Sequence, residues 1–179
     1  MPQQPMQPHP PMRGFTLFEA LMVLSVLALV MGLSVNWGQE AWARLQVEMA
    51  ARRLLVGLER GREAAERAGE PCALVLAGRQ GWEGQATDAA RACLGADTAL
   101  HEGLWPSTLR LAHSFAGPVH FTANGLAIDG GTVAVGSHGT SLVRCLVMSP
   151  PLGITRLGRY DQPVGDIPDA RACKPDPLL

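Results

Sequence analysis

A single apolar run near the N-terminus constrains this chain more than any other feature. Residues 15–35 read FTLFEALMVLSVLALVMGLSV, and Glu19 is the one charged side chain among these 21 residues. As an α-helix, a run of this length crosses a hydrocarbon layer about 30 Å thick. We therefore predict a transmembrane helix over residues 15–35.

The flanks of the run predict its orientation. Residues 1–14 are rich in Pro and Gln and carry one basic residue, Arg13, whereas Glu40 and Arg44 return the chain to water on the other side. Since basic residues are retained on the cytoplasmic side of a membrane, we expect the N-terminus in the cytoplasm and the rest of the chain exported.

Three explanations of the run compete. A cleaved signal peptide has a shorter apolar core, and its cleavage site would have to be Ala41-Trp42-Ala43, which lies far beyond the apolar residues. A plain membrane anchor accounts for the length but not for Glu19, because a carboxylate at the centre of an isolated span costs roughly 2.5–3.5 kcal/mol. Glu19 either reaches the interface from the helix end or meets a partner, and a partner would give it a function.

The residues at the start of the run carry a family resemblance. Residues 13–19, RGFTLFE, closely resemble the prepilin peptidase site of type IV pilins and type II secretion pseudopilins. The resemblance implies that residues 1–14 are a leader, that the peptidase cuts between Gly14 and Phe15, and that Phe15 is then methylated. It also implies an assembly role for Glu19, whose carboxylate compensates the N-terminal ammonium of a neighbouring subunit in the filament core.

Helical periodicity continues beyond the run. Small and apolar residues at spacings of three and four predict one packing face, made of Val47, Ala51, Leu54, Leu58, Gly61, Ala65 and Ala68. Charged residues cover the other faces, as is typical of a solvated helix. Gly69 and Pro71 predict the helix end. Residues 36–69 are therefore expected to be an amphipathic continuation of the same helix.

After Pro71 the pattern changes to short β-type runs separated by turns. The predicted strands are Ala73–Ala77, Leu109–His113, Val119–Thr122, Thr132–Val135, Leu142–Met148 and Ile154–Leu157. Because no helix separates them, they predict a mainly antiparallel sheet covered by the long helix, an α+β fold. We expect a sheet domain over residues 70–162 and a Pro-rich tail over residues 163–179. Residues 80–106 are predicted to be irregular, with Trp82 and Trp105 as anchors.

Three stretches of this region are similar to the FimT/GspH-type minor pilins and pseudopilins. They are residues 50–76 (AARRLLVGLERGREAAERAGEPCALVL), 119–125 (VHFTANG) and 142–156 (LVRCLVMSPPLGITR). The resemblance implies a pilin-like fold and a minor subunit that helps to initiate a filament. It also implies a place in the bacterial inner membrane with a periplasmic domain. The implied partners are prepilin peptidase and other minor pilins or pseudopilins.

FimT-like members of competent bacteria are associated with DNA binding through a basic C-terminal Gly-Arg-x-Arg pattern. Here that place reads Gly153-Ile154-Thr155-Arg156, so one arginine is missing. Residues 141–160 nevertheless carry three arginines and no acidic residue, and these are the candidate DNA ligands: Arg144, Arg156 and Arg159. Three phosphate contacts would give weak, salt-sensitive binding. Alternatively, these arginines face solvent or pair with Asp161 and Asp166.

Composition limits the role of nucleic acid further. The chain has 15 Lys and Arg residues against 16 Asp and Glu residues, a formal net charge of −1. No global basic field therefore indicates a nucleic-acid-binding protein, and any such role rests on a local patch.

Four cysteines fit an exported domain in which disulfides persist. They permit three pairings, among which the sequence alone does not choose. We favour Cys72–Cys93 and Cys145–Cys173, with the second fastening the tail to the sheet. A zinc site is the rival explanation, but no C-x-x-C pair exists and the histidines at 101, 113, 120 and 138 are scattered.

No catalytic motif stands out. The sequence contains no G-x-S-x-G elbow, no H-E-x-x-H and no phosphate-binding glycine loop, so we expect neither an enzyme nor a bound cofactor or metal. Two related functions fit. One is a minor type IV pilin that primes assembly and contributes to DNA uptake during natural transformation. The other is a minor pseudopilin of a type II secretion system that meets exported protein cargo. A plain membrane-anchored periplasmic binding domain is the alternative of another class.

Overall fold

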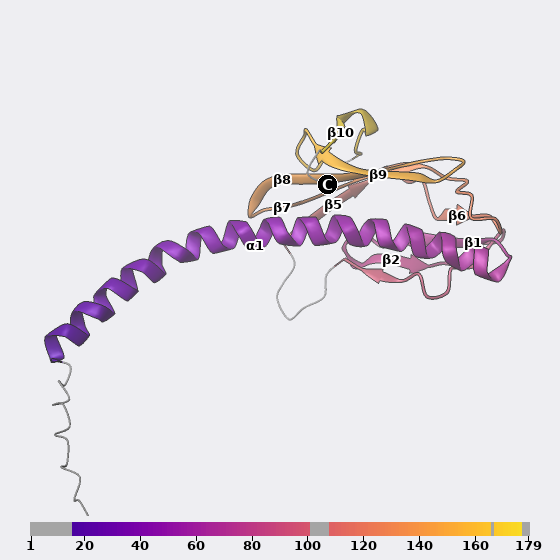
Figure 1. The fold of residues 1–179 in the computed structure, drawn as a ribbon. Coiled ribbons are helices and arrows are strands. Elements are labelled where there is room, and N and C mark those ends of the chain that lie inside the picture. Colours follow the sequence, from indigo (N-terminus) through magenta and orange to yellow (C-terminus); the bar gives the residue numbers. More distant parts are fainter. Residues whose placement is uncertain (1–15, 101–107, 166, 177–179) are drawn as a thin grey trace, which may run out of the picture. The chain divides into compact units, whose positions relative to one another are not determined.

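The computed structural model describes residues 16–100, 108–165 and 167–176. The chain divides into two compact units, Met1–Gly38 and Gln39–Leu179. Helix α1 supplies the described structure of the first unit and continues into the second, where the β-strands follow it in sequence (Figure 1).

Helix α1 spans Leu17–Ala68, close to the range expected from the periodicity. It ends at Gly69, whose φ of +64° is a left-handed conformation that glycine adopts without strain. The amide of Gly69 donates to the carbonyl of Glu66 at 3.2 Å, and Pro71 follows. Within the described parts of the chain, no helix is both long and apolar enough to cross a membrane. The transmembrane span expected at residues 15–35 is thus not confirmed.

The first sheet is made of the four strands that follow the helix in sequence and of one later strand, β6. Its strands are β1 (Cys72–Leu76), β2 (Gly81–Gly84), β3 (Arg91–Ala92), β4 (Thr98–Ala99) and β6 (Val119–Phe121). Their order is β3-β1-β2-β4, with β6 paired to β1. The β1–β3 pair is parallel and the other pairs are antiparallel.

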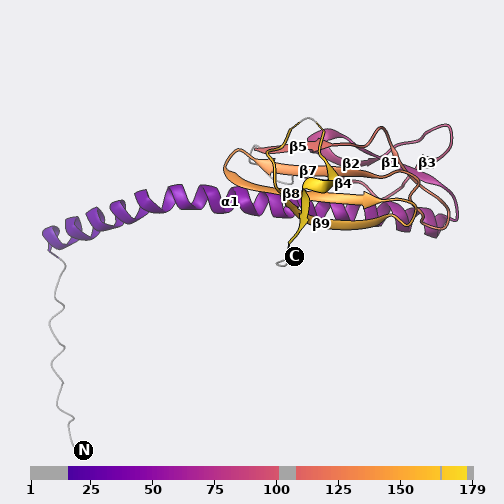
Figure 2. The same ribbon diagram turned by 90° about the horizontal axis from the view of Figure 1, so that it is seen from above.

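The second sheet is antiparallel throughout. Its strands are β5 (Leu109–His113), β7 (Gly131–Ser137), β8 (Thr140–Ser149), β9 (Ile154–Tyr160) and β10 (Cys173–Pro175). Their order is β10-β9-β8-β7-β5. Figure 2 shows β7, β8 and β9 running roughly along the second half of α1.

The α+β class and the mainly antiparallel pairing agree with the sequence-based expectation, although the strands form two sheets and not one. All six predicted strands are present, as β1 and β5 to β9. The region predicted to be irregular contains β2, β3 and β4, and the tail contains β10 after a short 3-10 helix, Ala170–Ala172. Trp105, predicted as an anchor, lies outside the described residues.

One continuous core joins the second half of α1 to both sheets. The buried apolar residues of the helix are Ala43, Val47, Ala50, Ala51, Leu54, Leu58 and Ala65. Their core partners from the two sheets include Leu74, Trp82, Phe121, Val133 and Leu146. Of the predicted helix face, Ala68 is exposed. One apolar face of the helix therefore packs against both sheets.

Trp82 is the centre of this packing. Its side chain is 1% exposed, and its indole Nε1 donates to the carbonyl of Leu54 at 2.8 Å. The indole lies against the helix at Gly57, where an added Cβ would come within 2.1 Å of Trp82 Cδ1. A glycine at this position thus lets a large aromatic ring approach the helix backbone.

The C-terminal tail is fastened to the second sheet. β10 pairs with β9, and Cys173 bonds Cys145 on β8. The amide of Asp169 donates to the Tyr160 hydroxyl at 2.9 Å. The tail therefore has its own small buried cluster, which includes Cys145, Val147, Tyr160, Ala172 and Cys173.

Candidate functional site

The residues that the sequence analysis assigns to assembly lie at the start of α1. Gly14 and Phe15, the predicted cleavage site, lie outside the described residues, and Glu19 lies in the first helical turn. Glu19 is exposed, and none of the described residues forms a hydrogen bond or ion pair with its carboxylate. A carboxylate in this position can form an ion pair with a cation of another molecule.

Thr16 caps this first turn. The amide of Glu19 donates to Thr16 Oγ1 at 3.3 Å, and the amide of Ala20 donates to the Thr16 carbonyl at 3.1 Å. Thr16 and Glu19 thus have the T-x-x-E spacing of a helix start, a signal that the sequence analysis missed. The cap fixes where α1 begins and so holds Glu19 in the first turn of the helix.

The helix behind Glu19 is apolar on all sides. Its exposed large apolar residues are Leu17, Phe18, Leu21, Met22, Val23, Leu24, Val26, Leu27, Leu29, Val30 and Met31. Ser25, a polar residue among them, donates its hydroxyl to the Met22 carbonyl at 2.8 Å, so its polar group is satisfied within the helix. An exposed apolar surface of this extent marks a region made to contact other apolar groups.

Arg144 lies in a buried ionic cluster and not at the surface. It is 6% exposed, its Nε donates to Glu48 Oε1 at 2.8 Å, and its Nη1 contacts Asp176 Oδ2. Desolvation opposes the charged form, but the hydrogen bonds and charges of Glu48 and Asp176 outweigh it and raise the Arg144 pKa above its ordinary value. The cluster ties β8 to the helix through Glu48 and to the tail through Asp176.

The three candidate DNA ligands therefore do not form one patch. In the register of β8 and β9, Arg144 lies opposite Arg159, whereas Arg156 lies opposite Val147. Because side chains alternate along a strand, Arg144 and Arg159 share one face of the sheet and Arg156 lies on the other. Only Arg156 and Arg159 are exposed. The expectation of three available cations is thus corrected to two, on opposite faces.

Within the described residues, the three arginines form none of the ion pairs with Asp161 and Asp166 that the sequence analysis gives as the alternative to DNA binding. Asp166 lies outside the described residues, and no ion pair of Asp161 is found among the described ones. Arg144 pairs instead with Glu48, which is 96 residues away in sequence, and with Asp176. Arg156 Nη2 donates to the carbonyl of Ala170 at 3.4 Å, which leaves its charge uncompensated.

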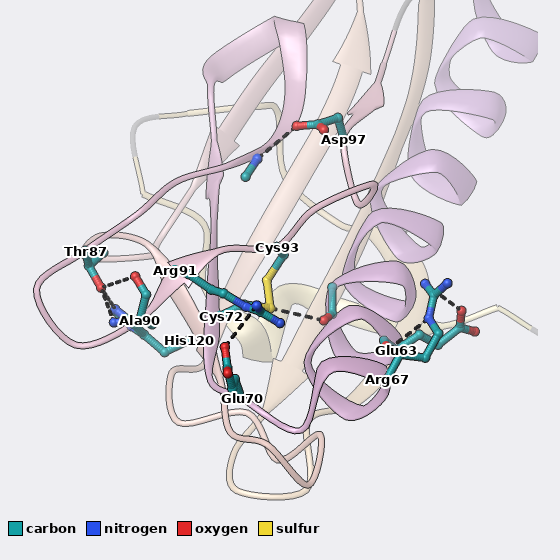
Figure 3. Close-up of a disulfide and its surroundings, with 12 residues drawn as sticks. Glu63, Arg67, Glu70, Cys72, Thr87, Ala90, Arg91, Cys93, Asp97 and His120 are labelled. Carbon is teal, nitrogen blue, oxygen red and sulfur yellow. Dashed lines mark hydrogen bonds and ion pairs between the residues drawn. A yellow bond between two sulfur atoms is a disulfide. The ribbon is translucent and has the colours of Figure 1, made fainter.

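The cysteines form the two pairs that the sequence analysis favours, Cys72–Cys93 and Cys145–Cys173. Figure 3 shows the first of these, where the chain leaves α1 and enters β1. Beside it Arg91 pairs with Glu70 at 2.9 Å. This disulfide fastens β3 to β1, whereas the second one fastens the tail to β8.

A Thr-His-Asp series near this disulfide has the residue types of a hydrolytic triad. His120 Nδ1 lies 2.7 Å from Asp129 Oδ2, and His120 Nε2 lies 3.4 Å from Thr87 Oγ1 (Figure 3 shows Thr87 and His120). However, the Thr87 hydroxyl accepts from the amide of Ala90 at 3.1 Å and lies within hydrogen-bond distance of its carbonyl. Thr87 therefore closes a turn in its own loop, and Asp129 orients His120 against that loop. We assign the series a structural role.

Metal-binding geometry is not found in the part of the chain that the structure describes, where no group of three or more His, Cys, Asp or Glu side chains comes together. His101, one of the scattered histidines, lies outside it.

Comparison with known proteins gives one match. The sequence model of the family described as type II transport protein GspH matches residues 50–152, more than half of the chain. The match runs from the second half of α1 to the turn between β8 and β9. The family is a structural pseudopilin family and not an enzyme family. No curated protein and no solved structure matches the chain.

Proposed function

The chain belongs to the GspH family of pilin-like minor subunits, and we propose that it is a minor pseudopilin of a type II secretion-type filament. In this proposal it is made as a precursor in the inner membrane, with residues 1–14 as its leader. Prepilin peptidase cuts between Gly14 and Phe15 and methylates Phe15. The sheet-containing unit then lies in the periplasm, where it contacts other minor subunits or exported protein cargo.

One observation carries the proposal: a GspH-type folded unit is joined to a helix segment that exposes apolar side chains and begins with a carboxylate. The family match covers residues 50–152 and therefore supports the folded unit alone. The peptidase-like residues 13–19 and the apolar run are separate support for the N-terminal segment. Two independent features, in adjoining parts of one chain, point to the same class of filament subunit.

Glu19 has the proposed role of setting the position of a new subunit. Cleavage after Gly14 would create an ammonium at Phe15, four residues before Glu19. An ammonium and a carboxylate from neighbouring subunits attract strongly in a dry filament core only when they meet, and either one alone would be costly. This contact would therefore favour one axial register between neighbouring subunits.

A type IV pilus minor pilin is the second candidate, and the exposed Arg156 and Arg159 are the observation that favours it. Both are cations on β9, in the region that resembles the DNA-binding segment of FimT-like proteins. With Arg144 neutralised and the remaining two on opposite faces, each face offers one phosphate contact. We therefore place DNA uptake behind secretion as the proposed role.

Exchange of Glu19 tests the proposal. The full chain would be produced with its native filament system as wild type, Glu19→Gln and Glu59→Gln, where Glu59 is an exposed carboxylate of the second half of α1. The measurement is the fraction of the chain that copurifies with the filament. We expect Glu19→Gln to lower this fraction about tenfold or more, which corresponds to roughly 1.4 kcal/mol.

Glu59→Gln should stay within about twofold of wild type, since a surface carboxylate contributes little. Equal incorporation of Glu19→Gln and wild type would contradict the role of Glu19. Absence of the wild-type chain from any filament would leave a plain membrane-anchored domain and end the proposal.

A further inference from the structure

A hollow of about 630 Å³ lies on the second sheet, and Gly136 of β7 and Val143 of β8 line it. These two residues lie opposite each other in the strand register. Their neighbour Val135 packs in the core with α1, and side chains alternate along a strand, so the hollow is on the face turned away from the helix. Its volume is within the range of about 300–1,000 Å³ that is typical of ligand sites.

Gly136 shapes this hollow. A Cβ at this position would come within 2.9 Å of Val164 Cγ2, so the absence of a side chain lets Val164 lie directly on the sheet. The register of β7 and β8 also shifts between Gly136 and Ser137. Such irregularities interrupt the surface of a sheet and are frequent beside binding sites. The segment after β9 thus forms one wall of the hollow, and the irregular end of β7 forms another.

Two charges of opposite sign line the hollow. Arg110 lies on β5 in register with Gly136, and Asp161 directly follows β9. Both are exposed, and neither forms an ion pair within the described part of the chain. Arg159 also borders the hollow, but it lies opposite Arg144, so its side chain is on the face toward α1. The hollow therefore offers a ligand one cation and one anion.

The separation of these two charges limits the ligand. The strand order β9-β8-β7-β5 places three strand spacings, roughly 14 Å, between the backbones at Asp161 and Arg110. A single amino acid carries its carboxylate and its ammonium on the same carbon atom and does not reach both. A short extended peptide does, since alternate residues point to the same side about 7 Å apart and two long side chains supply the remaining reach.

The other lining residues suit a peptide as well. Ser141 and Gln162 offer hydroxyl and amide groups that both donate and accept hydrogen bonds, as a peptide backbone requires. Val143 and Val164 offer apolar contact. A polyanion such as DNA fits less well, because Asp161 would repel it.

From this arrangement we propose that the hollow binds a short extended peptide, with a carboxylate of the peptide at Arg110 and a cation of the peptide at Asp161. An internal stretch of another polypeptide and a free short peptide share this chemistry. The site lies in the unit Gln39–Leu179 and does not depend on how the N-terminal segment is processed. The inference therefore goes beyond the proposed function.

Peptide titration of the full chain in detergent micelles, followed by amide NMR, tests the inference. The probe is acetyl-Glu-Ala-Lys-amide, and acetyl-Gln-Ala-Lys-amide and acetyl-Glu-Ala-Gln-amide each lack one of its charges. We expect the amides of Gly136 and Ser141 to shift on binding. The doubly charged peptide should bind at least about three times more tightly than either of the others, the effect of an exposed ion pair.

Matched variants assign each charge to its partner. Arg110→Gln should weaken binding of the doubly charged peptide about threefold and leave that of acetyl-Gln-Ala-Lys-amide unchanged. Asp161→Asn should weaken it equally and leave that of acetyl-Glu-Ala-Gln-amide unchanged. Arg60→Gln, which removes an exposed cation of α1, is the control and should have no effect. Ser141→Trp should abolish the shifts because the indole occupies the hollow.

A further peptide distinguishes the two sources. Unblocked Ala-Ala-Ala carries opposite charges at its two ends, so a response to it alone indicates a free short peptide, whereas a response to the blocked peptide indicates an internal stretch. No shift with any peptide would overturn the inference. Equal affinities of the three blocked peptides, equal effects of Arg110→Gln and Arg60→Gln, or tighter binding of a thymidine trinucleotide would overturn it as well.

Discussion

The two halves of α1 use their apolar side chains in different ways. In residues 17–32 the large apolar side chains are exposed. From Ala43 to Ala65 one face is buried against two sheets of the same chain. The second half therefore obtains its stability within the chain, whereas the first half exposes apolar surface that water disfavours. The difference teaches that one helix joins a unit that has its own core to a segment that has none.

Two tryptophans give the largest expected contrast. Trp82→Ala removes a ring that is 1% exposed and its hydrogen bond to Leu54, so the free energy of unfolding should fall by roughly 3–5 kcal/mol. Trp42→Ala changes an exposed ring of α1 and should alter the same free energy by no more than about 0.5 kcal/mol. Urea unfolding of the full chain followed by circular dichroism measures both. Similar losses in the two variants would contradict the assigned core.

Two cross-strand arginines give the next contrast. Arg144→Met removes the cation that pairs with Glu48 and with Asp176, and should cost about 3 kcal/mol because a largely buried ion pair with Glu48 is broken. Its neighbour Arg159 is exposed, and Arg159→Met should change stability by less than about 0.5 kcal/mol. Chemical unfolding again provides the measurement, and a stable Arg144→Met protein would show that the cluster is dispensable.

Two glycines of α1 test the comparison directly, one in each half. Gly57→Ala places a methyl group against Trp82 and should destabilise the folded unit by roughly 1–3 kcal/mol. Gly32→Ala meets no atom within 4 Å and should instead favour the helix by about 1 kcal/mol, since alanine has the higher helix propensity. Thermal unfolding and helix content by circular dichroism distinguish them. Destabilisation by Gly32→Ala would contradict the open surroundings of this position.

The smallest expected effect concerns the cap. Thr16→Ala removes the acceptor of the Glu19 amide and should weaken the first turn by about 1 kcal/mol, with no change in global unfolding. Amide hydrogen exchange at Glu19 should then become about five times faster, while amides of β8 stay unchanged. Unchanged exchange at Glu19 would show that Thr16 does not hold this turn.

Regular patterns in the sequence predicted much of the fold. The long helix followed from its apolar periodicity, and its end followed from Gly69 and Pro71, because both signals are local. The six predicted strands were found for the same reason. β2 was missed because two of its four residues are glycines, which are depleted in strands. β3 and β4 were missed because two-residue strands have no periodicity, and β10 was missed because it contains Lys174 and Pro175 and depends on the tail disulfide.

The candidate sites depended more on distant contacts. Counting charges over residues 141–160 placed Arg144 in a basic patch, because Glu48 and Asp176 lie outside that window. The T-x-x-E spacing of Thr16 and Glu19 was present in the sequence, but the helix cap was not predicted from it. Local residue patterns thus predicted the elements, whereas the pairing of charges required the three-dimensional structure.

The most direct test of the account is the intact mass of the chain isolated from its own membrane, compared with a Gly14→Glu variant. The account predicts a wild-type chain that begins at Phe15 and is one methyl group heavier than its sequence, and a variant that keeps residues 1–14. A wild-type chain that retains its leader, or one cut near Ala43, would contradict the claim that this protein is processed as a filament subunit.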